Sequence, residues 1–448
     1  MLAKIFTSDN RKFYKTLITL SVPIVIQNFL NSMVNLADSF MIGSLGVDAI
    51  NAVGFGNELF FLYVILLFGI CSGASIYMGQ YWGKNEIKSI HYVMGLCFII
   101  SMAASLVFCI VSLVFPEVFI SFFSKDENVI KLGSDYLRVV AITYILTAIT
   151  LTMNTALRSI NQTKIPMFTT FVALVINVVF NYIFIYIFKW GVVGAAIATA
   201  MARFAEVIAV IVISYKLKLP IAVKIGSYFK IPKEFIKPFF IAVVPVILNE
   251  FVWALGTTLY NVAYKAAGNE AQAAVRISAS VQNLFNVIGM GIGSACGIML
   301  ANQLGANRIE DAVKNSRKFL KISIVISSVM CILLLVSSPA LLSLYKVPQS
   351  VKDDAAIIMV IIAFGMIIRT YNFTTIVGIL RSGGDTKYCL MLDMLGVWLV
   401  GVPFVFVGAY LFKLPIYVLV LLVLSEEVFK FFLSTKRVMG NIWAKCMV

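Results

Sequence analysis

The chain has 448 residues, of which 61% are hydrophobic and only 13% are charged. A typical soluble domain has roughly 45–50% apolar and about 25% charged residues, so this chain has too much apolar surface to bury inside a water-soluble globule. Its net charge of +15 would suit a nucleic-acid partner only if Lys and Arg gathered on a soluble face. Here they lie between long apolar runs, and we expect an integral membrane protein without a nucleic-acid partner.

Twelve apolar runs are long enough to cross a bilayer, which takes roughly 20 helical residues. We expect spans at 17–42, 54–78, 92–115, 134–157, 166–188, 192–216, 238–263, 274–300, 319–342, 356–380, 388–412 and 414–435. The first 16 residues are polar and basic, and no small-residue cleavage site ends the first run, so we interpret it as a retained helix. The sequence therefore predicts an all-α integral membrane protein of twelve transmembrane helices.

The distribution of Lys and Arg predicts the orientation. The termini and five of the predicted loops, all on one side, hold 24 Lys and Arg residues, whereas the loops of the other side hold seven. Since basic residues concentrate on the cytoplasmic side, both termini are expected in the cytoplasm of a multi-pass protein of the cytoplasmic membrane. The longest basic loop lies near the midpoint, and we expect it to link two lobes, 1–216 and 238–448, through 217–237.

The two lobes are internal repeats. Leu157-Arg158-Ser159 with Thr163-Lys164 recurs 223 residues later as Leu380-Arg381-Ser382 with Thr386-Lys387. Further matches at an offset of 222 are Pro23 with Pro245, Gly46 with Gly268, Gly69 with Gly291, Gly83 with Gly305 and Asn85 with Asn307. Six crossings per repeat give two pseudo-symmetric, parallel six-helix lobes, which is typical of transporters whose halves rock about a central cavity.

Polar residues gather on one face of the first predicted span. Asn28, Asn31, Asn35 and Asp38 are spaced by three, four and three residues, which places them on one side of a helix. A charged side chain in a membrane is costly and usually faces an interior with a functional role. Asp38 is therefore a candidate cation or proton site, the alternative being a structural, hydrogen-bonded Asp.

Two later spans of the first lobe carry compatible oxygens. Asn177 and Asn181 lie four residues apart in the fifth span, and Thr199 lies early in the sixth. Carboxylate, amide and hydroxyl oxygens are hard ligands suited to Na⁺, while a buried Asp could instead carry a proton. Ordinary polar contacts between helices are the alternative.

The second lobe has its own buried-charge candidate. Glu250 lies inside the seventh span with no cation in the same helix, and desolvation would suit it to carrying a proton. Tyr260 and Tyr371 could line a cavity for flat cations, although aromatic residues also pack helix bundles. Asn31, Asn35, Asn154 and Gln282 complete the expected substrate- and proton-coupling set.

The remaining intramembrane charges are weaker candidates. Arg203 and Glu206 could pair within the sixth span, and Arg369 could face a cavity or an acid. We expect Asp393 near the interface, and the charges of the last span, Glu426, Glu427 and Lys430, to form solvated pairs.

The sequence lacks the motifs of the common catalytic classes. It has no Walker A sequence, no Gly-x-Ser-x-Gly elbow and no His-Glu-x-x-His. Its one histidine excludes a multi-His metal site, and its seven cysteines show no metal-site spacing. We therefore expect no enzyme activity and no cofactor, and energy from an ion gradient or from the substrate's own gradient.

Several motifs together resemble the multidrug and toxic compound extrusion (MATE) family over essentially the whole chain. They are Pro23 through Asp38-Ser39-Phe40-Met41-Ile42-Gly43 to Ala52-Val53-Gly54, then Gly79-Gln80-Tyr81-Trp82-Gly83-Lys84 with Asn302-Gln303-Leu304-Gly305-Ala306, the two Leu-Arg-Ser motifs, Asn177 to Phe184, and Gly191 to Ala196.

The resemblance implies two lobes that export cationic or amphipathic drugs against Na⁺ or H⁺. It also implies a first-lobe cation site at the positions matching Asp38, Asn177, Asn181 and Thr199. Many family members have a carboxylate where this chain has Asn181, which leaves Asp38 as the main ionisable group. Some members place an acid in the tenth span, and the stretch 368–374 has none.

Three rival functions stay open at this stage. A flippase for a lipid-linked saccharide would use a basic cavity, with Arg203 and Arg369 as candidates. A major facilitator transporter would show a basic Gly-Arg loop after the second span, where this chain has Gly83-Lys84. A membrane-embedded enzyme would need clustered His or acid pairs. The expected partners are small amphipathic or cationic substrates and the lipid bilayer, and the expected state is a monomer.

Overall fold

The computed structural model describes residues 8–343, 345 and 347–448, and within them every regular element is a helix, with no strand. The first half contains α1 (Ser8–Gly43), α2 (Val47–Gly83), α3 (Ile87–Val114), α4 (Pro116–Ser121), α5 (Glu127–Ser159), α6 (Lys164–Tyr182), η2 (Ile183–Ile187) and α7 (Gly191–Lys216). After a short 3₁₀ turn, η3 (Ile225–Ser227), the second half contains α8 (Lys233–Lys265), α9 (Asn269–Gly305), α10 (Ile309–Ser343), α11 (Gln349–Phe373), η4 (Thr374–Leu380), α12 (Thr386–Asp393), η5 (Met394–Gly401), α13 (Val402–Phe406), η6 (Val407–Leu411) and α14 (Ile416–Met439).

Ten helices of the described chain are long and apolar enough to cross a membrane by length and composition alone, the segments from α12 to η6 counting as one span, Thr386–Leu411. The two other expected spans correspond to α11 and α14, which have 25 and 24 residues and carry more charged side chains. Helices satisfy every interior backbone group within the segment, which is why lipid favours them. The expected twelve-helix, all-α membrane fold is confirmed.

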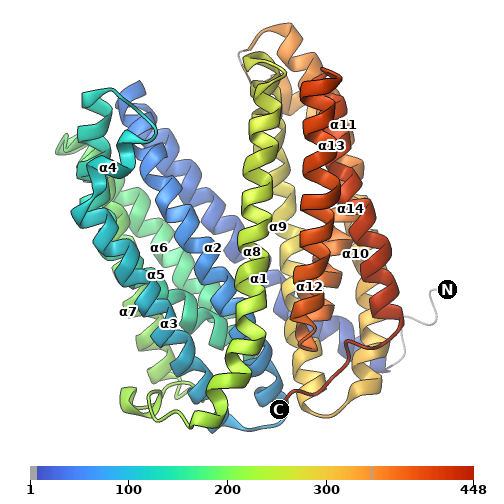
Figure 1. Ribbon diagram of the computed structural model, residues 1–448. Coiled ribbons are helices and arrows are strands. Elements are labelled where there is room, and N and C mark those ends of the chain that lie inside the picture. The colour runs from blue at the N-terminus through green and yellow to red at the C-terminus, as the bar shows by residue number, and fades with distance from the viewer. Residues whose placement is uncertain (1–7, 344, 346) are drawn as a thin grey trace. The chain divides into compact units, whose positions relative to one another are not determined.

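The chain divides into two compact units, each described here by itself. The N-terminal unit comprises Ile26–Trp82 and Glu86–Ile241, and the C-terminal unit comprises Met1–Val25, Gly83–Asn85 and Ala242–Val448. In Figure 1 the first is mostly blue to green and the second mostly yellow to red. The lobe boundaries expected from the sequence, 1–216 and 238–448 joined by 217–237, stay a prediction.

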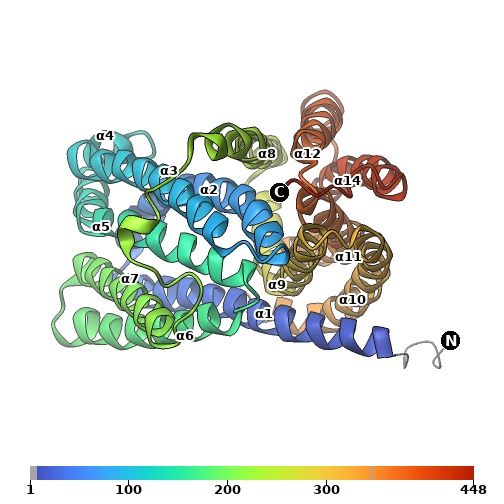
Figure 2. The same cartoon turned by 90° about the horizontal axis from the view of Figure 1, so that it is seen from below.

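Each unit is a bundle of closely packed helices. In the N-terminal unit α5 packs against both α3 and α7, and α7 packs against α6, as the end-on view of Figure 2 shows. In the C-terminal unit α11 packs against α9, α10 and α14, while α9 contacts η4 and α14 contacts η5. Charged side chains buried in one bundle can therefore contact partners on adjacent helices of the same unit.

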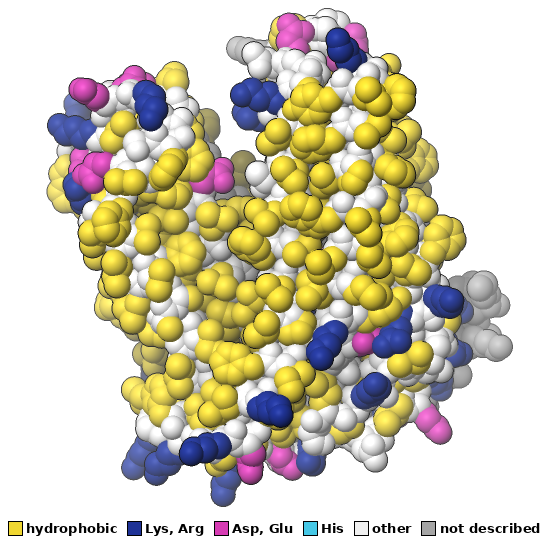
Figure 3. Space-filling view, in the orientation of Figure 1, with side chains coloured by type: hydrophobic (Ala, Val, Ile, Leu, Met, Phe, Trp, Pro, Cys, Tyr) yellow, Lys and Arg dark blue, Asp and Glu magenta, His cyan; other side chains and the backbone are white. Residues whose placement is uncertain are grey.

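The outer surface of both units suits a lipid environment. Large side chains such as Phe40, Phe171, Val325 and Leu399 are exposed, and hydrophobic side chains cover the flanks of the helices in Figure 3. Lys, Arg, Asp and Glu gather mainly toward the helix ends in the same view. A water-soluble monomer rarely exposes such large apolar areas.

The internal repeat is visible in the backbone as well as in the sequence. Left-handed residues, which have positive φ, end helices or form turns at matching places in the two halves. The matched pairs are Gly46 and Gly268, Asn85 and Asn307, Asn161 and Gly384, Lys189 and Lys413, and Lys218 and Asn441, at offsets of 222 to 224 residues. The two halves therefore share one chain path, as the sequence matches predicted.

Wide, π-helical turns interrupt the helices next to buried polar residues. η2 follows Asn181 and Tyr182, and its counterpart in the second half is η6. The second half has two more, η4 directly before Arg381 and η5 directly after Asp393. Since π-turns are rare and frequently lie at functional sites, they direct attention to these residues.

The linker between the halves folds back onto α3. The His91 ring contacts the carbonyl of Pro220 at 2.7 Å, and Tyr228 packs against His91 and Phe98. Burial raises the pKa of Tyr228 to about 12, so its hydroxyl stays protonated and donates to the carbonyl of Ile221. The linker is therefore a folded part of the N-terminal unit.

Close backbone packing at Gly95 gives a test of this arrangement. A Cβ at Gly95 would lie 1.8 Å from the Tyr228 carbonyl oxygen, whereas a Cβ at Gly226 meets nothing within 4 Å. We expect Gly95→Ala to destabilise the protein by about 1–3 kcal/mol, because the clash is with backbone. Melting temperatures in detergent would measure it, with Gly226→Ala as the matched control, and equal values for the two variants would contradict the packing.

Candidate functional site

A carboxylate, two amides and a hydroxyl meet in the N-terminal unit. Asn181 on α6 donates through Nδ2 to Asp38 Oδ1 on α1 at 2.5 Å and to Asn177 Oδ1 at 3.2 Å. Asn177 Nδ2 lies 3.5 Å from Thr199 Oγ1 on α7. Asn177 and Asn181 are buried, and Asp38 and Thr199 are partly buried. The structure thus brings together the four side chains expected to bind a cation, called here the Asp38 cluster.

The chemistry of this cluster limits what it can bind. Among the described residues no group of three or more His, Cys, Asp and Glu is placed to hold a metal ion. The Asp38 cluster offers one carboxylate together with neutral amide and hydroxyl oxygens, and Asn181 Oδ1 is buried with no hydrogen-bond partner in the described structure. Such a set suits a singly charged cation or a proton.

A second polar chain crosses the N-terminal unit from α5 to α7. Arg158 donates to Gln27 Oε1 at 2.5 Å, and Gln27 Nε2 donates to Thr170 Oγ1 at 3.1 Å. Thr170 in turn donates to Glu206 Oε1 at 3.1 Å. The chain ends at Arg203, whose guanidinium pairs with Glu206 Oε2 at 2.8 Å, as the spacing predicted.

A corresponding chain crosses the C-terminal unit, with more ionisable members. Arg381 donates to Asn249 Oδ1 on α8 and pairs with Glu250 at 2.7 Å. Asn249 Nδ2 donates to Asp393 Oδ2 at 2.6 Å. Asp393 Oδ1 then pairs with Lys430 Nζ on α14 at 2.5 Å.

Acidic groups of α14 extend this network. Lys430 also lies 3.6 Å from Glu426 Oε1, and Tyr260 on α8 donates its hydroxyl to Glu426 Oε2. The neighbouring Glu427 accepts from Asn372 Nδ2 at 2.8 Å and pairs with Arg369 on α11 at 3.5 Å. We call these residues, together with Arg381, Asn249, Glu250 and Asp393, the C-terminal charged cluster.

The two chains occupy equivalent positions of the internal repeat. Each begins with an Arg that donates to an amide of the first helix of its half, and passes from that amide to α6 or α12 and then to the last helix. The equivalent pairs are Arg158 and Arg381, Gln27 and Asn249, Thr170 and Asp393, and Glu206 and Lys430, at offsets of 222 to 224. The path is shared, but its third and fourth members differ in charge.

With this geometry established, comparison with known proteins identifies the family. The family model described as MatE matches residues 23–183 and 245–407, one stretch in each half. The chain belongs to the MatE family. It is therefore a multi-pass membrane transporter, and the resemblance seen in the sequence motifs is confirmed.

Relatives of this MatE protein share modest identity along most of its length. The probable multidrug resistance protein YoeA of Bacillus subtilis is 26% identical over 402 residues, covering 88% of this chain and 87% of YoeA. The probable multidrug resistance protein NorM of Thermotoga maritima is 22% identical over 442 residues, covering 96% and 93%. A crystal structure of MATE in complex with MaL6 has the same fold, with a TM-score of 0.86, 19% identity, and coverage of 95% and 96%.

The MatE protein differs from the sequence interpretation in its last helix. Glu426 and Lys430 were expected to be solvated and Asp393 to be interfacial, but all three are buried, with 3%, 3% and 7% of their surfaces exposed. These expectations were wrong because helices distant in sequence, α8, α12 and α14, bring these residues together. Glu250, expected to carry a proton and without a cation in its own helix, pairs with Arg381 from a distant segment.

Four other residues of the expected substrate- and proton-coupling set make no hydrogen bond to either cluster in the part of the chain that the structure describes. Asn31 is half-buried and Asn35 is exposed on α1. Asn154 on α5 and Gln282 on α9 are buried, and Asn154 Oδ1 and Gln282 Nε2 have no hydrogen-bond partner within the described chain. Gln27 and Thr170 were missed, although the 222- and 223-residue offsets to Asn249 and Asp393 could have revealed them.

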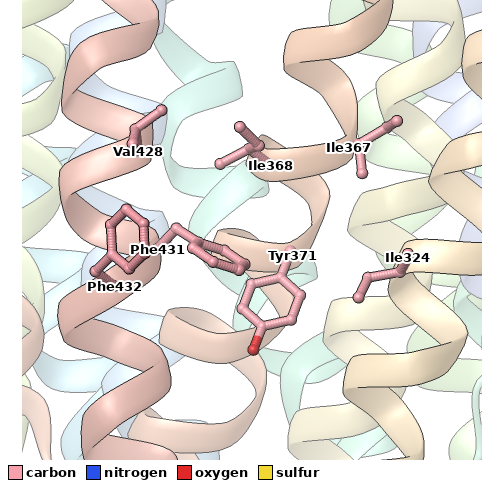
Figure 4. Close-up of a pocket in the computed structure, with 7 residues that line it drawn as sticks. All are labelled: Ile324, Ile367, Ile368, Tyr371, Val428, Phe431 and Phe432. Atoms are coloured by element: carbon pink, nitrogen blue, oxygen red, sulfur yellow. The ribbon is translucent and has the colours of Figure 1, made fainter.

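Tyr371 lines an apolar cavity of about 320 Å³ in the C-terminal unit. In Figure 4 its ring lies near Phe431 and its hydroxyl points away from Ile367 and Ile368; that hydroxyl contacts Thr435 Oγ1 at 3.0 Å. Phe432, another lining residue, is 66% exposed, so the cavity opens on an outer face of this unit. Its lining contains no charge to bind a cation.

The buried cation of the C-terminal charged cluster gives a stability test. Lys430→Met would leave Asp393 and Glu426 without their shared ammonium, and breaking a buried pair costs about 3–5 kcal/mol. We expect a lower melting temperature in detergent, partly restored when Asp393→Asn is added. Lys436→Met, at an exposed position of the same helix, is the control, and similar melting temperatures for both single variants would contradict the buried pair.

Proposed function

We propose that this MatE transporter exports cationic or amphipathic compounds in exchange for a coupling ion, Na⁺ or H⁺, bound at the Asp38 cluster. The observation that carries the proposal is the meeting of Asp38, Asn177, Asn181 and Thr199 from three helices around one buried amide. Family membership supplies the class of activity. A carboxylate within a membrane helix is costly and marks an ion or substrate path in many transporters.

The Asn181 amide is the element that would respond to the ion. Its Nδ2 donates to the oxygens of Asp38 and Asn177, so a positively polarised group stands between them. A cation bridging the same oxygens would favour a turned amide that presents Oδ1, which is the atom now buried without a partner. η2 begins at Ile183, two residues after Asn181. A turned amide would therefore change the hydrogen bonding next to a wide helical turn.

Coupling would then follow from shared conformational states. An ion bound at the Asp38 cluster would shift the balance between outward-open and inward-open states, and drug binding would shift it the other way. By linkage, the ion must weaken drug binding by the same factor as the drug weakens ion binding. Neither ligand needs to touch the other for exchange to occur.

Relatives support the substrate class. YoeA and NorM are both named as probable multidrug resistance proteins, and we extend that activity to this chain. The rival role as a lipid-linked saccharide flippase depended on Arg203 and Arg369 as basic groups of a cavity. Both pair with carboxylates, Glu206 and Glu427, so their charge is compensated and the rival is not favoured.

The remaining features of the proposal concern the cell. We place the protein in the cytoplasmic membrane as a monomer, with both termini on the cytoplasmic side, because 24 Lys and Arg residues lie on one side of the predicted topology. The two six-helix lobes would move relative to each other in alternating access.

The first experiment measures efflux of a fluorescent cation, ethidium, from cells that express the protein. A Na⁺ gradient and a pH gradient are imposed separately, so that the driving ion is identified. We expect Asp38→Asn to reduce efflux to the level of cells without the transporter, because the only carboxylate of the Asp38 cluster is lost. Expression of the variant is checked by immunoblot of membranes.

The control is Asp48→Asn, which changes a partly buried carboxylate at the start of α2 that accepts a hydrogen bond from Asn128. It should leave efflux unchanged. An active Asp38→Asn protein would disprove the role of Asp38, and absent efflux under both gradients with good expression would favour the lipid-linked substrate.

A second variant tests the amide. Asn181→Leu keeps the size of the side chain and removes Oδ1, the oxygen that the turned amide would present to the cation. A polar contact to a charged group contributes about 1.5–3 kcal/mol, so the ion concentration for half-maximal efflux should rise about 10- to 100-fold. Asn128→Leu is the matched control, and an unchanged ion dependence for Asn181→Leu would exclude the amide from coupling.

A further inference from the structure

The C-terminal charged cluster carries more acids than cations. Its described members are four carboxylates, Glu250, Asp393, Glu426 and Glu427, against three cations, Arg369, Arg381 and Lys430. Glu426 and Lys430 are 3% exposed, and the side chains of Glu250 and Glu427 are each 14% exposed. An uncompensated buried negative charge is strongly unfavourable in a membrane bundle.

Distances show which acid lacks a cation of its own. Arg381 pairs with Glu250 at 2.7 Å, and Lys430 pairs with Asp393 at 2.5 Å. Arg369 lies 3.5 Å from Glu427. Glu426 reaches only Lys430, at 3.6 Å, which is already held closely by Asp393.

We propose that Glu426 is a proton-binding site of this transporter, separate from the Asp38 cluster. A proton compensates the extra charge because the close packing of Gly401, Tyr260 and Glu426 leaves no room for a larger ion. The proton adds to the Glu426 carboxylate and gives a neutral carboxylic acid. Nothing in this step requires the Asp38 cluster to bind an ion.

The surroundings of Glu426 fit a neutral acid. Tyr260 donates to it from α8, and Gly401 leaves no spare room, since a Cβ there would lie 2.0 Å from the Tyr260 hydroxyl and 2.8 Å from Glu426 Oε2. The other titratable groups that face it are Tyr264 on α8, Arg369 on α11, Asp393 through Lys430, and Glu427 and Lys430 on its own helix. Strong local packing excludes a hydrated ion.

A second observation marks the cluster as incomplete in its hydrogen bonding. Asn372 is 3% exposed and holds Glu427 through Nδ2, while its Oδ1 has no hydrogen-bond partner among the described residues. A buried acceptor without a donor, beside an excess of carboxylates, indicates a site short of protons. An added proton removes the excess negative charge of this cluster.

Protonation would change which helices Lys430 connects. With Glu426 neutral, the ammonium is free to stay with Asp393 and join α14 to the end of α12. With Glu426 charged, Lys430 is drawn toward an acid one turn earlier on its own helix, and its contact with Asp393 weakens. Asp393 directly precedes η5, so a proton at Glu426 would control a contact at a wide helical turn.

The N-terminal unit supplies an internal comparison. There Glu206 is buried at the equivalent position of Lys430 and faces Arg203 at 2.8 Å, with Thr170 in place of Asp393. It has a close cation of its own and should stay charged. Glu206→Gln is therefore a matched control for a buried Glu in a helix of the same repeat.

Infrared difference spectroscopy of the purified, full-length protein tests the proposal without any transport assay. Protonated carboxyl groups give a C=O band apart from carboxylate bands, and uniform ¹³C-Glu labelling shifts only bands from Glu. Spectra are recorded as the pH is raised, for Asp38→Asn protein, so that the Asp38 cluster does not contribute. We expect a Glu-derived carboxylic acid band that disappears with rising pH.

Variants then assign the band. It should be lost in Glu426→Gln, which keeps an acceptor for Tyr260, and should persist in Glu427→Gln, Glu250→Gln and Glu206→Gln. Absence of a Glu-derived band in the Asp38→Asn protein would overturn the proposal, as would loss of the band in any of the three control variants but not in Glu426→Gln. If Glu426→Gln does not fold, loss of the band in any control variant overturns the proposal, and its persistence in all three supports it.

Discussion

The arginine that ends the fourth span of each half is held by a side-chain amide from the first helix of that half, and much of each unit's polar interior follows from this contact. A guanidinium keeps its charge inside a membrane and needs local hydrogen-bond acceptors or an acid. Arg158 uses Gln27, and Arg381 uses Asn249 with Glu250. The amide oxygen accepts from the Arg, so the amide NH₂ needs an acceptor of its own. That acceptor lies on α6 or α12, and it extends the polar path to the last helix.

From the same start the two halves have diverged in charge. The N-terminal path ends in the ion pair of Glu206 with Arg203. The Asp38 cluster of the same unit combines a carboxylate with neutral oxygens. The C-terminal path gathers four acids and three cations, and the position equivalent to Asp38 is Tyr260. One repeat is thus suited to a cation among neutral ligands, and the other to the movement of a proton among charged ones.

The sequence predicted the spans and the repeat, because apolar length and helical spacing are local properties. The meeting of Asp38 with Asn177, Asn181 and Thr199 joins three helices, and it was implied by the resemblance to the MATE family. The sequence failed for Glu426, Lys430 and Asp393, since hydropathy alone cannot show which helices face one another. Glu426 and Lys430 have partners on α8 and α12, and Asp393 has partners on α8 and α14. Comparing the halves position by position would have recovered Gln27 and Thr170, whose roles depend only on the shared chain path.

The docked linker has a consequence for how the chain can be divided. The linker contacts at His91, Pro220, Tyr228 and Ile221 all lie within the N-terminal unit. A break in the chain just after Tyr228 would therefore leave these contacts intact. The two fragments would have to be co-expressed, because the first part of α1, up to Val25, belongs to the C-terminal unit and would come from the first fragment. Such a split protein would allow the two fragments to be labelled separately.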